Sequence, residues 1–208
     1  MRSFHVSALA VVGVFCAFGV AGCISVPIPK AEADATRYYV LSSEGGRSAV
    51  QTDAPIVYLR PIEVATYLNS RPLVVRRGDH EIEFKEFARW GEPLELGIAR
   101  VVREGLLGSG AVSKVLTSGA RGRSGETTFE LNVRVLACEG SADGAVIFRA
   151  RWELAPSEAK GGATRSGDYR PMELRWDGKN GESLASQLSV AVAGLAKEIS
   201  SGVESKKE

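Results

Sequence analysis

A regular alternation of apolar and polar residues marks the second half of the chain. It runs through 129–135, where Phe, Leu and Val alternate with Glu, Asn and Arg, and again through 146–154. Gly-Ser-Ala-Asp-Gly at 140–144 separates the two runs and supplies turn residues. A period of two is typical of strands with one buried and one wet face, so these runs predict an antiparallel pair.

Shorter β-rich runs occur on both sides of this pair. Leu73–Arg76 and Glu81–Phe87 flank Gly78 and Asp79, which favours a hairpin. Further strands are expected at 37–41, 56–62, 112–116 and 164–174.

Two segments instead repeat their apolar residues at helical spacing. The first covers 94–106, with Pro93 suited to the first turn and Gly108 and Gly110 suited to end the helix. The second covers 184–199, with Ser183 as a possible N-cap.

The order of these elements is four strands, a helix, four strands and a helix. Strand runs segregated from helices indicate the α+β class. We therefore expect a single domain over 37–202, in which two helices pack on one face of a twisted, mainly antiparallel sheet, followed by a frayed tail over 203–208.

The N-terminus has the layout of a secretory signal. Arg2 precedes an almost wholly apolar run over 6–22, which is short for a membrane-spanning helix. The run ends in Val20-Ala21-Gly22-Cys23, which resembles the bacterial lipobox. Small residues before a cysteine suit a peptidase cleft, and the thiol is the group that accepts diacylglycerol. The sequence therefore predicts a lipoprotein signal peptide over 1–22 and lipid attachment at Cys23.

Residues 23–36 contain Pro27, Pro29 and no periodic pattern, so they are expected to form the lipidated N-terminus and a flexible tether. Two or three acyl chains would hold the protein firmly on a membrane. Ile24 stands where an Asp would resemble an inner-membrane retention signal. The expected location is therefore the periplasmic face of the outer membrane, in its inner leaflet, with the inner membrane as the less favoured choice.

Composition narrows the function further. Residues with hydrophobic side chains make up 44% and charged residues 25%, which suits a globular domain. Loss of Arg2 with the leader would leave equal numbers of basic and acidic residues, which argues against nucleic-acid binding. Cys138 would then lack a disulfide partner and is expected to be a small buried residue.

Motifs for chemistry are missing from the body of the chain. His80 is the only histidine after the leader, so no metal site and no cofactor are expected. The Gly- and Arg-rich stretch 118–125 lacks the Walker lysine, and no nucleophile elbow occurs. The protein is therefore expected not to be an enzyme.

Three segments resemble a known family of lipoproteins. They are Tyr38-Tyr39-Val40-Leu41, the stretch 62–76 with Tyr67-Leu68-Asn69-Ser70-Arg71-Pro72, and the stretch 86–94 with Arg89-Trp90-Gly91-Glu92-Pro93-Leu94. With the lipobox, these segments are similar to the ABC-type transport auxiliary lipoproteins, the PqiC/YmbA family. Asn69-Ser70 makes the spacing before Arg71 one residue longer than the family pattern.

The resemblance implies an adaptor in intermembrane lipid transport. Such a lipoprotein accompanies an MCE-domain protein with an ABC permease and ATPase, and docks on the MCE protein at the outer membrane. The alternative is a carrier that binds a lipid or small apolar molecule itself. Tyr67, Leu68, Arg71 and Trp90 combine aromatic area with a forked cation, as binding hot spots do. In the other reading of these residues, Tyr67 and Trp90 pack on the sheet and Arg71 pairs with Glu86 or Glu92.

Overall fold

A computed structural model describes residues 35–43, 46, 48–51, 53–117, 127–157 and 163–204. The predicted signal peptide, Cys23, nearly all of the tether and the Gly- and Arg-rich stretch 118–125 lie outside these residues. Within them, no helix is both long and apolar enough to span a bilayer.

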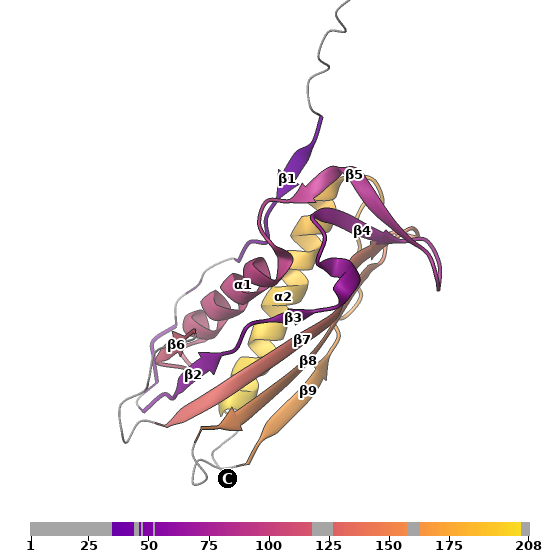
Figure 1. The fold of residues 1–208 in the computed structure, drawn as a ribbon. Helices are drawn as coiled ribbons and strands as arrows, with labels where there is room; N and C mark the ends of the chain where they lie inside the picture. The colour runs from indigo at the N-terminus through magenta and orange to yellow at the C-terminus, as the bar shows by residue number, and fades with distance from the viewer. Residues whose placement is uncertain are drawn as a thin grey trace, which may run out of the picture. The chain divides into compact units, whose positions relative to one another are not determined.

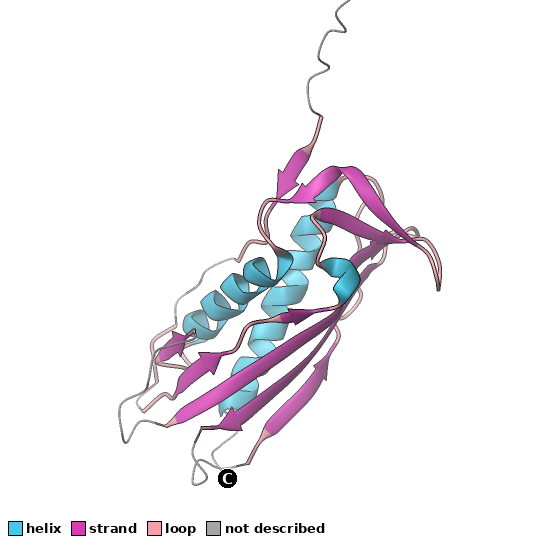
Figure 2. Cartoon of the chain, viewed as in Figure 1, coloured by secondary structure: helices cyan, strands magenta, loops and turns pink. Residues whose placement is uncertain are grey.

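The described elements follow the predicted order closely (Figures 1 and 2). The first half contains β1 (Arg37–Tyr39), β2 (Ile56–Leu59), β3 (Glu63–Val64), the 3-10 turn η1 (Thr66–Leu68), β4 (Pro72–Arg76), β5 (Ile82–Trp90) and α1 (Leu94–Ser109). The second half contains β6 (Lys114–Leu116), β7 (Thr128–Ser141), β8 (Val146–Pro156), β9 (Arg165–Tyr169) and α2 (Gly181–Glu204).

Strand β7 organises the sheet. On one edge it pairs with β8 in antiparallel fashion, from Phe129↔Pro156 to Gly140↔Val146, and β9 continues beyond β8. Along its other edge β2, β3 and β4 pair in parallel, one after the other. Because β7 has 14 residues, it is long enough to take three short strands end to end.

The α+β fold in a single domain is confirmed, and the sheet of the described residues is mixed. The antiparallel pairs are β4–β5, β7–β8 and β8–β9. The pairs of β7 with β2, β3 and β4, of β2 with β6 and of β1 with β5 are parallel. The parallel pairs join segments far apart in the chain, and sequence periodicity carries no information on such pairing.

Both helices cover one face of the sheet and pack against each other (Figure 1). Their predicted apolar stripes are buried: Leu94, Ile98, Val101, Val102 and Leu106 in α1, and Leu184, Leu188, Val192, Leu195 and Ile199 in α2. Gly105 permits the close approach, because a Cβ there would lie 2.6 Å from that of Ala196. Helix α1 ends at Gly110 in the left-handed conformation, as predicted.

The limits of α2 differ from those expected. The helix begins at Gly181, because the Asn180 side chain accepts a hydrogen bond from the Glu182 N–H (3.0 Å). Ser183 instead accepts a bond from the Asp177 N–H (3.2 Å) and is not the cap. The helix continues to Glu204 with Val203 buried, so the prediction of a frayed tail from residue 203 is wrong for Val203 and Glu204.

Candidate functional site

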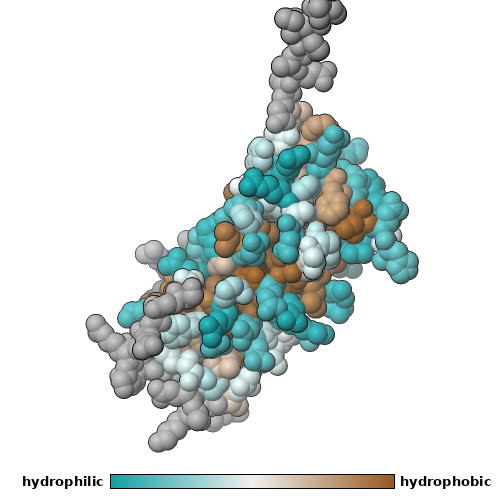
Figure 3. Space-filling view, in the orientation of Figure 1, coloured by the Kyte–Doolittle hydropathy of each residue, from teal (hydrophilic) through white to brown (hydrophobic). Residues whose placement is uncertain are grey.

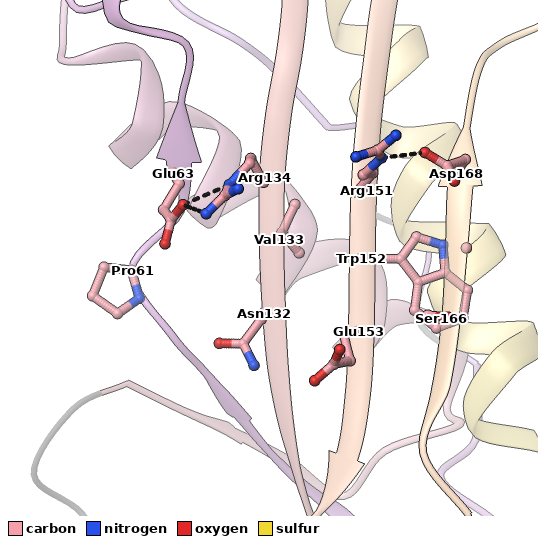
Figure 4. A pocket seen from close by; sticks show the side chains of 11 residues that line it. Pro61, Glu63, Asn132, Val133, Arg134, Arg151, Trp152, Glu153, Ser166 and Asp168 are labelled. Carbon is pink, nitrogen blue, oxygen red and sulfur yellow. Dashed lines mark hydrogen bonds and ion pairs between the residues drawn. The ribbon is translucent and has the colours of Figure 1, made fainter.

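The face of β7 and β8 turned away from the helices is an open, charged surface. Alternation places Asn132 and Arg134 of β7 and Arg151 and Glu153 of β8 on this side, where all four are exposed. Glu63 of β3 and Asp168 of β9 border them (Figure 4). We call these six residues the open face.

Ion pairs across neighbouring strands order the open face. Arg134 Nη2 lies 2.6 Å from Glu63 Oε2, and Arg151 Nε lies 2.7 Å from Asp168 Oδ1. Figure 4 shows the pairs on opposite sides of a shallow depression of about 500 Å³. Each side chain in these pairs is more than 60% exposed, since the exposures are 63% and 63% for the first pair and 67% and 69% for the second.

Such pairs contribute little to folding, because water screens them and two long side chains lose freedom. The guanidinium and carboxylate groups can therefore exchange partners at small cost. An open surface that carries both signs of charge is suited to bind a protein whose surface has complementary charges.

A second cluster lies where η1 and β4 meet β7. Glu139 is completely buried, and its Oε1 accepts a hydrogen bond from Arg76 Nε at 2.6 Å. Its Oε2 has no hydrogen-bond partner among the described residues. Tyr67 borders the cluster and donates from its hydroxyl to the Leu136 carbonyl over 3.5 Å. Burial, followed by the Glu139 carboxylate, raises the pKa of Tyr67.

Cys138 adjoins this cluster and is buried with a free thiol, as expected. Burial and the adjacent Glu139 carboxylate raise the pKa of the thiol. A thiol held in its protonated form is a poor nucleophile. Among the residues that the structure describes, no group of three His, Cys, Asp or Glu residues is placed to hold a metal ion.

The four residues predicted to form a binding hot spot do not share one exposed surface. Leu68 and Trp90 are buried, Tyr67 is half-buried against the core, and only Arg71 is exposed. This placement agrees with the packing interpretation of the two aromatic residues. The ion pair of Arg71 in that interpretation does not form among the described residues, either with Glu86 or with Glu92, whose carboxylate lies 2.6 Å from Arg100 instead. The predicted lipobox, Val20 to Gly22, and Cys23 lie outside the described residues.

Sequence reasoning missed the pairing on the open face and the burial of Glu139. Alternation does mark Arg134 and Arg151 as outward-facing, but their partners come from β3 and β9, whose positions depend on the sheet topology. A β-bulge between Val135 and Ala137 interrupts the alternation of β7. Beyond the bulge, Ala137 to Gly140 are all buried. The alternation of apolar and polar residues therefore did not predict that Glu139 is buried.

Comparison with known proteins is consistent with the sequence resemblance. Residues 39–200 match the family model of the ABC-type transport auxiliary lipoprotein component. No curated protein matches the sequence.

Two solved structures have a similar fold. Protein XCC0632 from Xanthomonas campestris, of family DUF330, superposes with a TM-score of 0.63 at 15% identity, covering 79% of this chain and 93% of that one. The crystal structure of an uncharacterised protein superposes with a TM-score of 0.61 at 19% identity, covering 81% of this chain and 98% of that one. At these identities the likeness concerns the fold alone.

Proposed function

Because the chain belongs to the family of ABC-type transport auxiliary lipoprotein components, we propose that it is the membrane-anchored, non-enzymatic adaptor of an ABC/MCE-type intermembrane lipid transport system. The observation that carries this proposal is the family match, which covers 39–200. The protein's partners would be an MCE-domain protein and its ABC permease and ATPase.

Anchoring would depend on Cys23. After cleavage of residues 1–22, acyl chains on Cys23 would hold the protein in the inner leaflet of the outer membrane, and residues 23–36 would link them to the folded domain. At roughly 5–6 Å × √n, a tether of this length spans on the order of 20 Å. The domain would therefore stay close to the membrane while it meets a partner that arrives through the periplasm.

Docking would use the open face. Neither helix covers it, and its two ion pairs are expected to contribute little to folding because their side chains are more than 60% exposed. A partner with complementary charges could replace the intramolecular pairs with intermolecular ones.

The alternative function is a lipid carrier, which needs an enclosed apolar pocket. The depression on the open face is lined mostly by charged and polar side chains, which supports the adaptor. Native mass spectrometry of the full protein distinguishes the two functions. A co-purified lipid in stoichiometric amount, beyond the covalent acyl chains, would favour the carrier.

Affinity capture of the acylated protein from its own membranes tests the adaptor. We expect an MCE-domain protein to co-purify, and deletion of the gene to change envelope permeability or lipid distribution. A Cys23→Ser variant serves as control, because it keeps the folded domain and loses the attachment site. Capture of no transporter component, with an unchanged envelope after deletion, would contradict the proposal.

A further inference from the structure

Large apolar side chains reach the surface around β1 and β5, the part of the domain where the described chain begins. Tyr38 is 58% exposed, Val40 55%, Phe84 45% and Phe87 53%. Figure 3 shows apolar side chains at the surface over β4 and β5. Transfer of such side chains from water into an apolar phase is favourable in proportion to the area buried.

These side chains lie on both sides of one narrow piece of sheet. Strand β1 pairs in parallel with the end of β5, with Arg37 opposite Ala88. Tyr38 and Val40 both lie beside Gly91, where a Cβ would be 3.9 Å from the Cβ of Tyr38 and 3.3 Å from Val40 Cγ1. We call β1 together with Phe84–Gly91 the β1–β5 edge.

The other side of this edge combines an aromatic ring with cations. Phe87 lines a shallow groove together with the cations Arg37, Lys85 and Lys179, and the carboxylates of Glu83 and Glu86 line it as well. Glu83 in the same groove is neutralised by Lys85, at 3.2 Å, and by Arg77, with which it forms an ion pair. Aromatic rings flanked by Lys and Arg are the composition found at the interface between lipid and water, where long cationic side chains reach the headgroups.

The short length of chain between Cys23 and the described residues indicates what contacts the β1–β5 edge. Ala35 is the first described residue and lines the same groove as Phe87. About a dozen residues separate it from Cys23, which gives a reach of roughly 20 Å. Since this end of the domain is the one held nearest to the acyl chains, the surface that it meets first is the bilayer.

We propose that the β1–β5 edge rests on the bilayer, with Tyr38, Phe84 and Phe87 in the lipid interface and Arg37, Lys85 and Lys179 against the headgroups. This inference depends on the acyl anchor of the proposed function. The contact fixes how the domain is oriented on the membrane, and it adds to the acyl chains a second point of attachment.

A polarity-sensitive dye tests the contact. The acylated full-length protein is reconstituted in vesicles of phosphatidylethanolamine and phosphatidylglycerol, with the dye on Glu86→Cys in the edge or, as matched control, on Val190→Cys in α2, which is 52% exposed. Labelling is expected to be selective, because Cys138 is buried and the thiol of Cys23 would be blocked by its acyl chain. We expect a blue shift at position 86 and quenching by brominated lipid that is several-fold stronger than at position 190.

A second variant shows whether the aromatic residues cause the contact. Tyr38→Ser with Phe87→Ser should abolish the blue shift of the dye at position 86 while the protein still floats with the vesicles. Because both side chains are more than half exposed, the melting temperature should change little.

Each other outcome overturns the inference. If the wild-type protein floats while the dye at position 86 stays in water, the contact is wrong and the anchor stands. If the protein fails to float with the vesicles, both the membrane contact and the acyl anchor are wrong. A blue shift that depends on protein density and is insensitive to brominated lipid would assign the β1–β5 edge to a second copy of the chain.

Discussion

The two faces of β7 and β8 differ in nearly every physical respect, although they share one backbone. On the face under the helices, side chains such as Leu131, Phe148 and Leu154 are almost completely buried. On the open face, Arg134 and Arg151 pair with acids while more than 60% exposed, at 63% and 67%. We therefore expect most of the sheet's contribution to folding stability to come from the buried face. The charged side chains of the open face can change with little loss of stability, so they could serve recognition.

The largest loss of stability should follow from a cavity on the packed face. Phe148 is 2% exposed, and its ring lies edge-on to that of Tyr169 at 6.1 Å between centroids. Phe148→Ala should lower the free energy of unfolding by about 4 kcal/mol, measured by urea denaturation. Arg149→Ala, the next residue on the opposite face, should change it by no more than about 0.5 kcal/mol. Equal effects of the two variants would contradict the comparison.

The next largest effect should come from the buried charge. Arg76→Ala leaves Glu139, which is 0% exposed, without its cation, and should lower the free energy of unfolding by about 3 kcal/mol. This loss is at the lower end of what is expected when one partner of a buried ion pair is removed, because the Arg76 side chain is itself 29% exposed. Arg76→Met with Glu139→Leu should recover most of the loss. If the double variant were as unstable as Arg76→Ala, the unpaired carboxylate would not be the cause.

A smaller effect should appear in alkaline solution. The unfolded chain releases the Cys138 proton above its ordinary pKa of 9.0, whereas the folded protein keeps it because burial raises the pKa. The stabilising contribution is therefore complete below pH 9.0 and is lost as the pH rises above it, by about 1.4 kcal/mol per pH unit. Urea denaturation at pH 8 and pH 10 should show a flatter dependence for Cys138→Ala than for the wild type. Identical slopes would mean that the thiol does not titrate differently on unfolding.

Local patterns predicted the packed face well. The period of two in 129–135 and 146–154 identified β7 and β8 and both of their faces, and the helical stripes identified α1 and α2. These features depend on neighbours in the sequence, and each is repeated over several residues.

The open face and the Glu139 cluster were not predictable in the same way. Glu63 contacts Arg134 only because β3 pairs in parallel with β7. Arg76 contacts Glu139 only because β4 also pairs in parallel with β7, nearer to the end of that strand. Burial of Trp90 likewise removes a residue that composition favoured as a hot spot. Contacts between segments far apart in the chain decided these cases, and composition alone does not distinguish an aromatic side chain in the core from one at an interface.

The smallest effect on stability should accompany the largest effect on recognition. Exchanging one pair, Glu63→Arg with Arg134→Glu, keeps an ion pair between β3 and β7 and reverses its direction. The free energy of unfolding should change by less than about 1 kcal/mol, because both side chains are 63% exposed. Capture of the proposed MCE-domain partner should fall several-fold, since a charged surface discriminates by the placement of each sign. The exchange of Arg60 and Glu130, paired at 2.6 Å on the same side of β7 but outside the depression, is the matched control and shows whether the effect is confined to the open face. Unchanged capture by the first exchange would mean that the partner docks elsewhere on the domain, whatever the adaptor's role.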